Sequence, residues 1–276
     1  MKPFKPKVRA PDPRLLSSTR GVLLRYGVVT VCEASACPNR AECYGRRTAT
    51  FMILGRTCTR ACRFCNVPTG RGTPPDPTEP HRIARAVEEL GLDYVVVTSV
   101  DRDDLSDYGS DHFAKTVAAI RRRTPQVRIE LLTPDFRGDE DALERVVSAA
   151  PDKLAHNEET VRRLSPLVRP QSDYDRSLRV LGYYAKRFGG VVKSSLMVGL
   201  GERREELIET MRDLRKVGVR ELTIGQYLQP SAAHHPVVRY HDESYFDDLR
   251  QEALEIGFRA VAAGVLVRSS YYADRL

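Results

Sequence analysis

The sequence lacks any run of about 18 apolar residues, so it contains no candidate membrane-spanning helix. It also lacks the apolar core of a secretory signal, because residues 1–13 are rich in proline and lysine instead. We interpret these residues as a flexible lead-in. The two absences predict a cytoplasmic protein that does not act on membranes.

Long basic runs are absent as well, and residues 121–123 form the longest one. Aromatic residues make up only 7% of the chain, and none form a stacking pattern beside basic residues. We therefore expect no nucleic-acid partner. The net charge of +7 instead favours an acidic protein partner or an anionic ligand.

Cysteine is absent from the 211 residues that follow Cys65, and all six cysteines lie between Cys32 and Cys65. Structural disulfides would be expected in a secreted protein, with cysteines spread along the chain. A cluster of this kind indicates metal ligation instead.

The six cysteines form two triplets. Their patterns are C-x4-C-x5-C for Cys32, Cys37 and Cys43, and C-x3-C-x2-C for Cys58, Cys62 and Cys65. Six thiolates cannot close two four-ligand zinc sites, and only one C-x2-C pair is present. Iron–sulfur clusters suit thiolates equally well, and three cysteines would leave one iron of a 4Fe–4S cluster without a cysteine ligand.

Short β-branched runs alternate with amphipathic stretches along the chain. The expected strands are residues 51–54, 94–100, 127–132, 153–155, 191–198 and 221–228. The expected helices include residues 79–90, 111–123, 140–149, 173–188 and 204–217. Six such repeats predict an α/β fold with parallel strands, which is a partial (β/α)6 barrel. We expect an N-terminal extension (1–48), the barrel (49–257) and a C-terminal extension (258–276).

Unusual polar motifs follow each expected strand. They are residues 57–65, 101–104, 133–136, 156–157, 199–202 and 226–230, in chain order. Each has an ordinary alternative: Asp101 could begin a helix, Gly199 could form a simple turn and His156 could be a core histidine. Their shared position at the carboxyl ends of the strands favours a common site.

The C-x3-C-x2-C triplet resembles the signature of the radical S-adenosylmethionine superfamily. The resemblance implies that S-adenosylmethionine binds the open iron through its amino and carboxylate groups. Reductive cleavage would then give a 5′-deoxyadenosyl radical that abstracts hydrogen. Phe64, before the last cysteine, would pack near the adenine, and ordinary core packing is its alternative.

The two triplets together resemble those of lipoyl synthases. Further stretches agree, namely residues 49–55, 98–105, 225–231 and 268–271, and the resemblance runs from Gly21 to Tyr271. Three positions depart from the family pattern: Tyr44 replaces a frequent Trp, Ser195 interrupts a glycine-containing stretch and Glu158 replaces an apolar residue.

This resemblance implies two 4Fe–4S clusters and the insertion of sulfur at C6 and C8 of an octanoyl chain on a carrier lysine. The cluster of Cys32, Cys37 and Cys43 would donate the sulfur, with Ser270 as its fourth ligand. Ordinary turn hydrogen bonding is the alternative for Ser270. Arg268 would contact the substrate or the cluster environment. The implied S-adenosylmethionine contacts are Asp101, Arg102, Asp103, Lys193 and Glu202.

The implied partners are an octanoylated lipoyl domain, an electron donor such as flavodoxin or ferredoxin, and an iron–sulfur carrier that rebuilds the spent cluster. The lipoyl domain would belong to the glycine cleavage H protein or to a 2-oxoacid dehydrogenase acyltransferase subunit. One alternative is another sulfur-inserting radical enzyme, similar to biotin synthase or to a methylthiotransferase. A second is a non-catalytic protein that binds zinc or nucleic acid.

Overall fold

The computed structural model describes residues 13–35, 37–46, 48–271 and 273–276, so most of the expected lead-in lies outside the described residues. The strands are β1 (Thr50–Ile53), β2 (Tyr94–Ser99), β3 (Arg128–Leu132), β4 (Lys153–Ala155), β5 (Val191–Val198), β6 (Glu221–Gln226) and β7 (Ala260–Gly264). The α-helices are α1 (Pro13–Tyr26), α2 (Val31–Ala34), α3 (Arg40–Gly45), α4 (Glu79–Leu90), α5 (Ser110–Arg123), α6 (Glu140–Ser148), α7 (Ser165–Val168), α8 (Tyr174–Arg187), α9 (Arg204–Lys216) and α10 (Glu243–Ile256). Two short 3-10 helices are η1 (Phe136–Gly138) and η2 (Ala273–Arg275).

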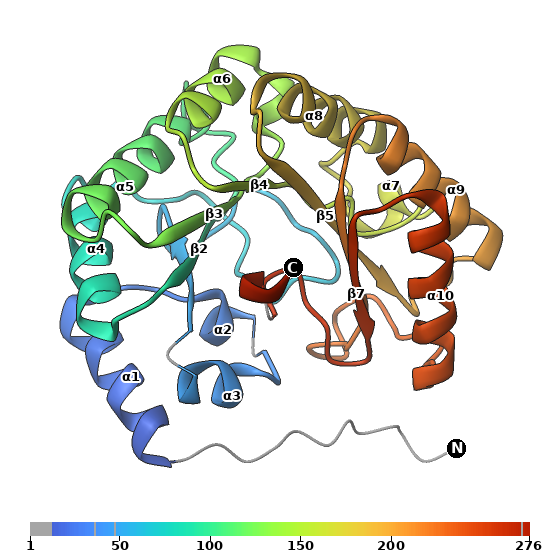
Figure 1. Ribbon diagram of the computed structural model, residues 1–276, viewed down its shortest axis with the longest axis horizontal. Helices are drawn as coiled ribbons and strands as arrows, with labels where there is room; N and C mark the ends of the chain where they lie inside the picture. The colour runs from blue at the N-terminus through green and yellow to red at the C-terminus, as the bar shows by residue number, and fades with distance from the viewer. Residues whose placement is uncertain (1–12, 36, 47, 272) are drawn as a thin grey trace. The chain divides into compact units, whose positions relative to one another are not determined.

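The strand order in the sheet is the order of the strands along the chain, β1 to β7 (Figure 1). The β1–β2, β2–β3, β5–β6 and β6–β7 pairs are all parallel, with Thr50 opposite Val96 and Ser194 opposite Leu222. Parallel neighbours need crossover connections, and helices supply them. The α/β fold predicted from the sequence is confirmed.

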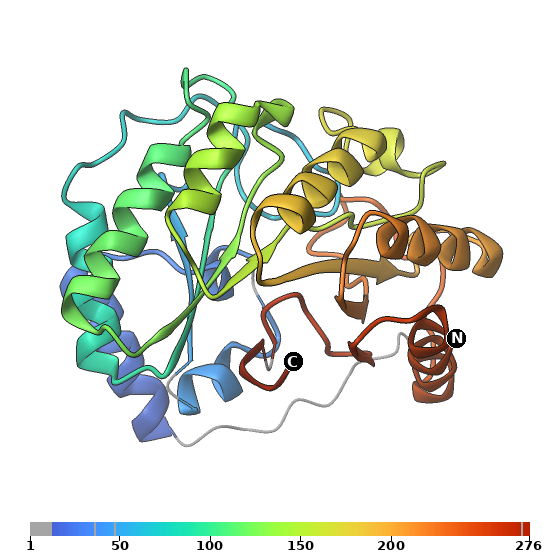
Figure 2. The ribbon, with the colours of Figure 1, turned by 45° about the horizontal axis from the view of Figure 1, so that its top comes forward.

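The chain divides into two compact units. Among the described residues, the N-terminal unit contains residues 13–60 and Asn66–Leu154, and the C-terminal unit contains Ala61–Cys65 and Ala155–Leu276. In the N-terminal unit, α4 packs on α5 and α5 on α6. In the C-terminal unit, α9 contacts both α8 and α10 (Figure 2).

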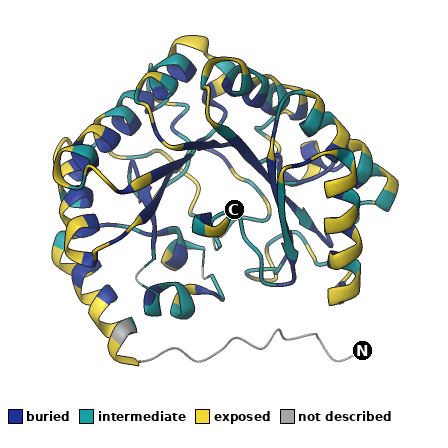
Figure 3. Ribbon diagram, viewed as in Figure 1, coloured by how far each residue is buried: buried dark blue, intermediate teal, exposed yellow. Residues whose placement is uncertain are grey.

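Burial follows the pattern expected of a parallel sheet. All four residues of β1 and all six of β6 are buried, whereas the outward faces of the helices are exposed (Figure 3). Strands buried on both faces consist of consecutive apolar residues, as Val95, Val96 and Val97 of β2 do. This explains why runs of β-branched residues located the strands.

Several helices begin and end at side chains whose chemistry explains the boundary. Asp139 accepts a hydrogen bond from the Ala142 amide at the start of α6, and Asp173 accepts one from the Arg176 amide at the start of α8. Helix α4 ends at Gly91, whose φ of 59° lies in the left-handed region.

Two C-terminal elements, β7 and α10, were not predicted from the sequence. Strand β7 pairs with β6 and lies in the segment that we expected to be an extension, so six strands was one too few. Its Ala-rich sequence has little β propensity, and pairing with β6 determines its conformation. Helix α10 also lay outside the expected repeats. None of the described helices is both long and apolar enough to span a membrane.

Candidate active site

The C-x3-C-x2-C triplet lies on the loop that follows β1. The Cys58 amide donates to the Pro68 carbonyl oxygen at 2.9 Å, and the Gly70 amide donates to the Cys58 carbonyl oxygen at 2.8 Å. These two hydrogen bonds hold Cys58 against residues 68–70, which lie further along the same loop. The thiol of Cys58 is half-buried and is not part of a disulfide.

The second part of the loop belongs to the C-terminal unit. The Cys65 amide donates to the Cys62 carbonyl oxygen at 3.0 Å, so the C-x2-C segment forms a tight turn. His234 Nε2 lies 3.1 Å from the Cys65 carbonyl oxygen, and the His235 amide donates to the Arg63 carbonyl oxygen at 2.8 Å. The sequence analysis missed both histidines, although they follow the motif at the end of β6.

The thiols of Cys58, Cys62 and Cys65 are half-buried, and none of them is in a disulfide. Throughout the described part of the chain, no three His, Cys, Asp or Glu side chains converge as the ligands of one metal ion do. A 4Fe–4S cluster binds each thiolate on a different iron, so its cysteines need not converge on one point.

The first triplet lies on α2, α3 and their connection, within the N-terminal unit. Cys32 is buried, and burial raises the pKa of its thiol to about 11. Burial, together with the charges of Cys32 and Cys37, raises the pKa of Cys43 to about 12. Repulsion between the negative charges of neighbouring thiolates contributes to the shift at Cys43, and a bound cation or cluster would relieve this repulsion.

Arg60, between Cys58 and Cys62, is the most heavily paired residue of the loop. Its guanidinium is 2% exposed and contacts Asp135 at 2.6 Å, Asp103 at 2.8 Å and Asp101 at 3.2 Å. Burial opposes the charge of Arg60, but the three carboxylates outweigh it and raise the pKa of the guanidinium. The loop is thereby tied to the segments that follow β2 and β3.

Asp101 and Asp103 were predicted to contact S-adenosylmethionine, and both form ion pairs with Arg60. Asp101 also lies close to the C-x3-C-x2-C triplet, because its Oδ2 is 3.7 Å from the Cys58 sulfur. Burial acts to raise the pKa of Asp103, but hydrogen bonds from Arg60 and Arg137 outweigh it and lower the pKa. Their predicted contact with S-adenosylmethionine stays a prediction.

Arg102 lies between these two aspartates but is paired elsewhere. It is 2% exposed and forms a two-point pair with Asp104, with N–O distances of 2.7 and 2.9 Å. Its Nη1 also lies 3.4 Å from the Leu54 carbonyl oxygen. These contacts favour a supporting role for Arg102, and its predicted contact with S-adenosylmethionine stays untested.

Lys193 on β5 contacts residues 268–271, which we call the C-terminal motif. Its ammonium group donates to the Ser269 carbonyl oxygen at 2.8 Å. The motif itself forms a turn, in which the Tyr271 amide donates to the Arg268 carbonyl oxygen at 3.0 Å, and Ser270 is half-buried there. The contact favours a role for Lys193 in holding this turn, and its predicted role toward S-adenosylmethionine stays a prediction.

The C-terminal turn is also packed tightly against β6. A Cβ atom on Gly225 would lie 2.0 Å from the Val267 carbonyl oxygen, so only glycine allows this approach. Arg268 Nη1 donates to the same Val267 oxygen at 2.6 Å. The Arg268 side chain therefore helps to close the turn.

Glu202, after β5, accepts hydrogen bonds from the amides of its own loop. Gly199 donates at 2.6 Å and Leu200 at 2.9 Å. Burial raises the pKa of Glu202 although these backbone hydrogen bonds oppose the change. Phe64, the predicted adenine neighbour, is half-buried on the triplet loop. The predicted cofactor contacts of both residues stay predictions.

The motif after β4 contains both ordinary and unusual groups. His156 is buried, and its Nε2 lies 3.0 Å from the Ser177 hydroxyl, as expected of a satisfied core histidine. Asn157 donates to Glu159 at 3.0 Å, and burial raises the pKa of Glu159. The sequence analysis missed Glu159, because a single glutamate after an expected strand is not informative.

Comparisons with known proteins show which family the chain resembles. The radical SAM superfamily matches residues 52–214. A lipoyl synthase of Nitrosospira multiformis is 49% identical over 99% of this chain and 87% of its own. Lipoyl synthases of Rubrobacter xylanophilus and Treponema denticola are 51% and 48% identical, over 97% and 98% of this chain and 84% and 92% of their own.

Solved structures share the fold at low sequence identity. SuiB of Streptococcus suis, bound to its precursor peptide SuiA, has a TM-score of 0.60 and 11% identity over 96% of this chain and 58% of its own. Methylornithine synthase has a TM-score of 0.56 and 15% identity over 94% and 80% of the two chains. These similarities support the fold alone.

Proposed function

The chain belongs to the lipoyl synthase family of the radical SAM superfamily, and we propose how its residues divide that family's reaction. It is a transferase that uses S-adenosylmethionine and 4Fe–4S chemistry to insert sulfur into an octanoyl chain on a carrier protein. This family membership excludes the alternative of a non-catalytic protein that binds zinc or nucleic acid. The residue assignments below are our proposal.

Two separate clusters are the centre of the proposal. Cys58, Cys62 and Cys65 hold the radical cluster, whereas Cys32, Cys37 and Cys43 hold the auxiliary cluster with Ser270 as fourth ligand. This division is supported by the positions of the two triplets in different elements. The first triplet lies on α2, α3 and their connection, and the second lies on the loop after β1. When bound, the radical cluster would supply the electron that cleaves S-adenosylmethionine, and the auxiliary cluster would supply sulfide for the new carbon–sulfur bonds.

The residues of the chain then orient these groups. Arg60 fixes the radical-cluster loop through its three carboxylate partners and neutralises Asp101 beside Cys58. Asp103, Lys193 and Glu202 remain proposed neighbours of S-adenosylmethionine. A serine oxygen is a harder donor than a thiolate, so Ser270 would hold its iron less tightly than the cysteines do.

We propose that the carrier is the lipoyl domain of the glycine cleavage H protein or of a 2-oxoacid dehydrogenase acyltransferase subunit. The net charge of +7 supports an acidic carrier. A flavodoxin or ferredoxin would supply electrons, and an iron–sulfur carrier would rebuild the auxiliary cluster. We also propose a cytoplasmic location, which six cysteines without disulfides favour.

Two triple variants test the division of labour. Replacing Cys58, Cys62 and Cys65 with Ala should remove half of the iron and abolish cleavage of S-adenosylmethionine. Replacing Cys32, Cys37 and Cys43 with Ala should remove the other half, preserve cleavage and abolish the lipoyl product. Cleavage that survives in the first variant would refute the radical-cluster assignment.

A further inference from the structure

We propose that Glu79 and His112 are positioning residues for the radical-cluster loop, because together they hold Leu54, from which that loop leaves β1. The inference rests on the proposed assignment of Cys58, Cys62 and Cys65 to the radical cluster. Neither residue belongs to a cysteine motif or to the predicted S-adenosylmethionine contacts.

A single carboxylate oxygen joins the three residues. Glu79 Oε2 accepts the Leu54 amide hydrogen at 2.9 Å and lies 2.8 Å from His112 Nε2. Glu79 is the first residue of α4, and His112 lies in the first turn of α5. Glu79 and His112 are 7% and 6% exposed, so these hydrogen bonds form away from bulk water. When the Glu79 carboxylate accepts this hydrogen bond, Nε2 of His112 is the donor.

Leu54 needs this support because of its backbone. Its φ of 68° is left-handed, a conformation that non-glycine residues rarely adopt. Gly55 follows with a φ of 95°, so the chain changes direction immediately after β1. A residue in such a conformation persists when its surroundings determine it. The next cysteine, Cys58, is four residues further on.

Two other contacts shape the same position. A Cβ atom on Gly109 would lie 2.3 Å from Leu54 Cδ1, so the glycine makes room for the Leu54 side chain. Arg102 Nη1 lies 3.4 Å from the Leu54 carbonyl oxygen, which is a weaker contact than that of Glu79 with the amide. The Glu79 carboxylate is therefore the principal polar support of this turn.

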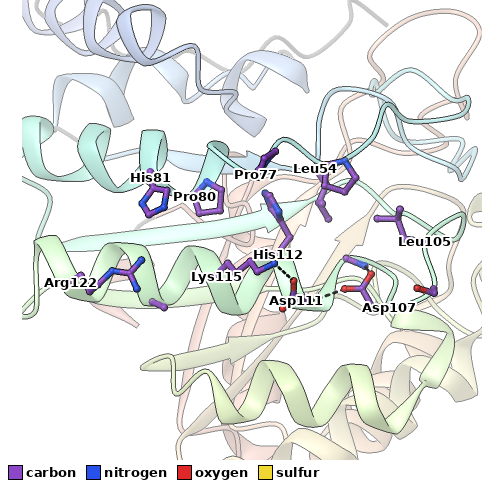
Figure 4. A pocket seen from close by; sticks show the side chains of 14 residues that line it. Leu54, Pro77, Pro80, His81, Leu105, Asp107, Asp111, His112, Lys115 and Arg122 are labelled. Atoms are coloured by element: carbon purple, nitrogen blue, oxygen red, sulfur yellow. Dashed lines mark hydrogen bonds and ion pairs between the residues drawn. The ribbon is translucent and has the colours of Figure 1, made fainter.

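A cavity lies beside Leu54 and His112. It has a volume of about 530 Å³, and its lining includes Leu54, His112 and Pro80 (Figure 4). With the Glu79 carboxylate removed, the Leu54 amide would lose its hydrogen-bond acceptor. The turn at Leu54 would then no longer be held in one conformation. The loop that follows it and carries Cys58 would lose its fixed position.

Hydrogen exchange at the Leu54 amide tests the contact without depending on activity. In Glu79→Ala the amide should exchange at least about tenfold faster than in the parent protein, the effect of one lost buried hydrogen bond. Glu79→Gln keeps an oxygen acceptor and should restore most of the protection. Glu88→Ala, on the exposed end of the same helix, is the matched control and should leave this amide unchanged.

Cluster measurements test the consequence. The background is the variant with Cys32, Cys37 and Cys43 replaced by Ala, in which only the radical triplet binds iron. Glu79→Ala and His112→Ala should there lose at least about half of the iron during gel filtration, and cleavage of S-adenosylmethionine per chain should fall with it. Glu79→Gln should retain both.

The inference would be overturned if Glu79→Ala kept the parental exchange rate of the Leu54 amide, the parental iron content and the parental cleavage of S-adenosylmethionine. So would a loss in Glu79→Gln as large as that in Glu79→Ala, since the oxygen acceptor would then be irrelevant. If Glu79→Ala does not fold, His112→Ala and Glu79→Gln decide by the same readouts. Failure of the proposed function is distinguishable, because it appears as cleavage that survives replacement of Cys58, Cys62 and Cys65.

Discussion

The Lys193 ammonium group donates a 2.8 Å hydrogen bond to the Ser269 carbonyl oxygen, and so joins β5 to the turn that contains Ser270. Lys193 is fully buried, so this contact forms where water cannot compete. The residue immediately after its acceptor is the proposed serine ligand. We infer that Lys193 positions Ser270.

Replacing Lys193 with Met keeps the length of the side chain and removes the ammonium group. Because the turn would lose its anchor, we expect sulfur insertion to fall at least about tenfold, the equivalent of one charged hydrogen bond. Cleavage of S-adenosylmethionine should stay near the parental rate. A raised KM for S-adenosylmethionine instead would support the original prediction that Lys193 contacts that cofactor.

Ser270→Ala should impair sulfur insertion and leave hydrogen abstraction possible, since only the auxiliary cluster loses a ligand. Ser269→Ala is the matched control, because Ser269 contributes its backbone carbonyl to the contact with Lys193. Deuterium transfer from a labelled octanoyl chain to 5′-deoxyadenosine measures abstraction, and mass spectrometry of the carrier measures insertion. Equal loss of both activities in a folded Ser270→Ala protein would argue against this assignment.

Part of this site was predictable from the sequence, and part was not. The bounds of β4 and β5 match the prediction. In β5 the local signal is the set of apolar residues Val191, Val192, Leu196, Met197 and Val198. The partners of Arg60 were not predictable, because Asp103 and Asp135 lie 43 and 75 residues away along the chain. Lys193 lies 76 residues from Ser269, so a strand motif alone could not reveal their contact.

Arg60→Met should destabilise the N-terminal unit, because three carboxylates would lose their buried partner. Breaking a buried pair in this way costs about 3–5 kcal/mol. Arg63→Met is the matched control, since Arg63 lies on the same loop and is exposed. Urea unfolding of the cluster-free proteins measures the difference, and equal stabilities of the two variants would contradict the role given to Arg60.

Glu158 should make stability depend on pH. Burial raises the pKa of this fully buried carboxyl well above its ordinary value of 4.5, although Arg169 opposes the shift. An acid with a raised folded-state pKa contributes stability below its ordinary pKa and loses that contribution as pH rises through the folded-state value. Glu158→Gln cannot ionise, so its stability relative to the parent protein should increase as pH rises above about 5.

Urea unfolding of the cluster-free parent and Glu158→Gln proteins between about pH 5 and 9 checks this expectation. Glu205→Gln, an exposed position at the start of α9, is the control and should show no such trend. A stability difference between Glu158→Gln and the parent that does not change with pH would contradict a raised pKa.

The most direct test of the account concerns the origin of the inserted sulfur. The clusters are rebuilt with heavy-isotope sulfide, unlabelled S-adenosylmethionine and an octanoylated carrier are supplied, and the lipoyl product is weighed. All six cysteines are assigned as cluster ligands, so cluster sulfide is the sulfur that this chain can donate. We predict a product with two heavy sulfur atoms and at most one product per polypeptide. An unlabelled lipoyl product would contradict the assignment of Cys32, Cys37 and Cys43 to a sulfur-donating cluster.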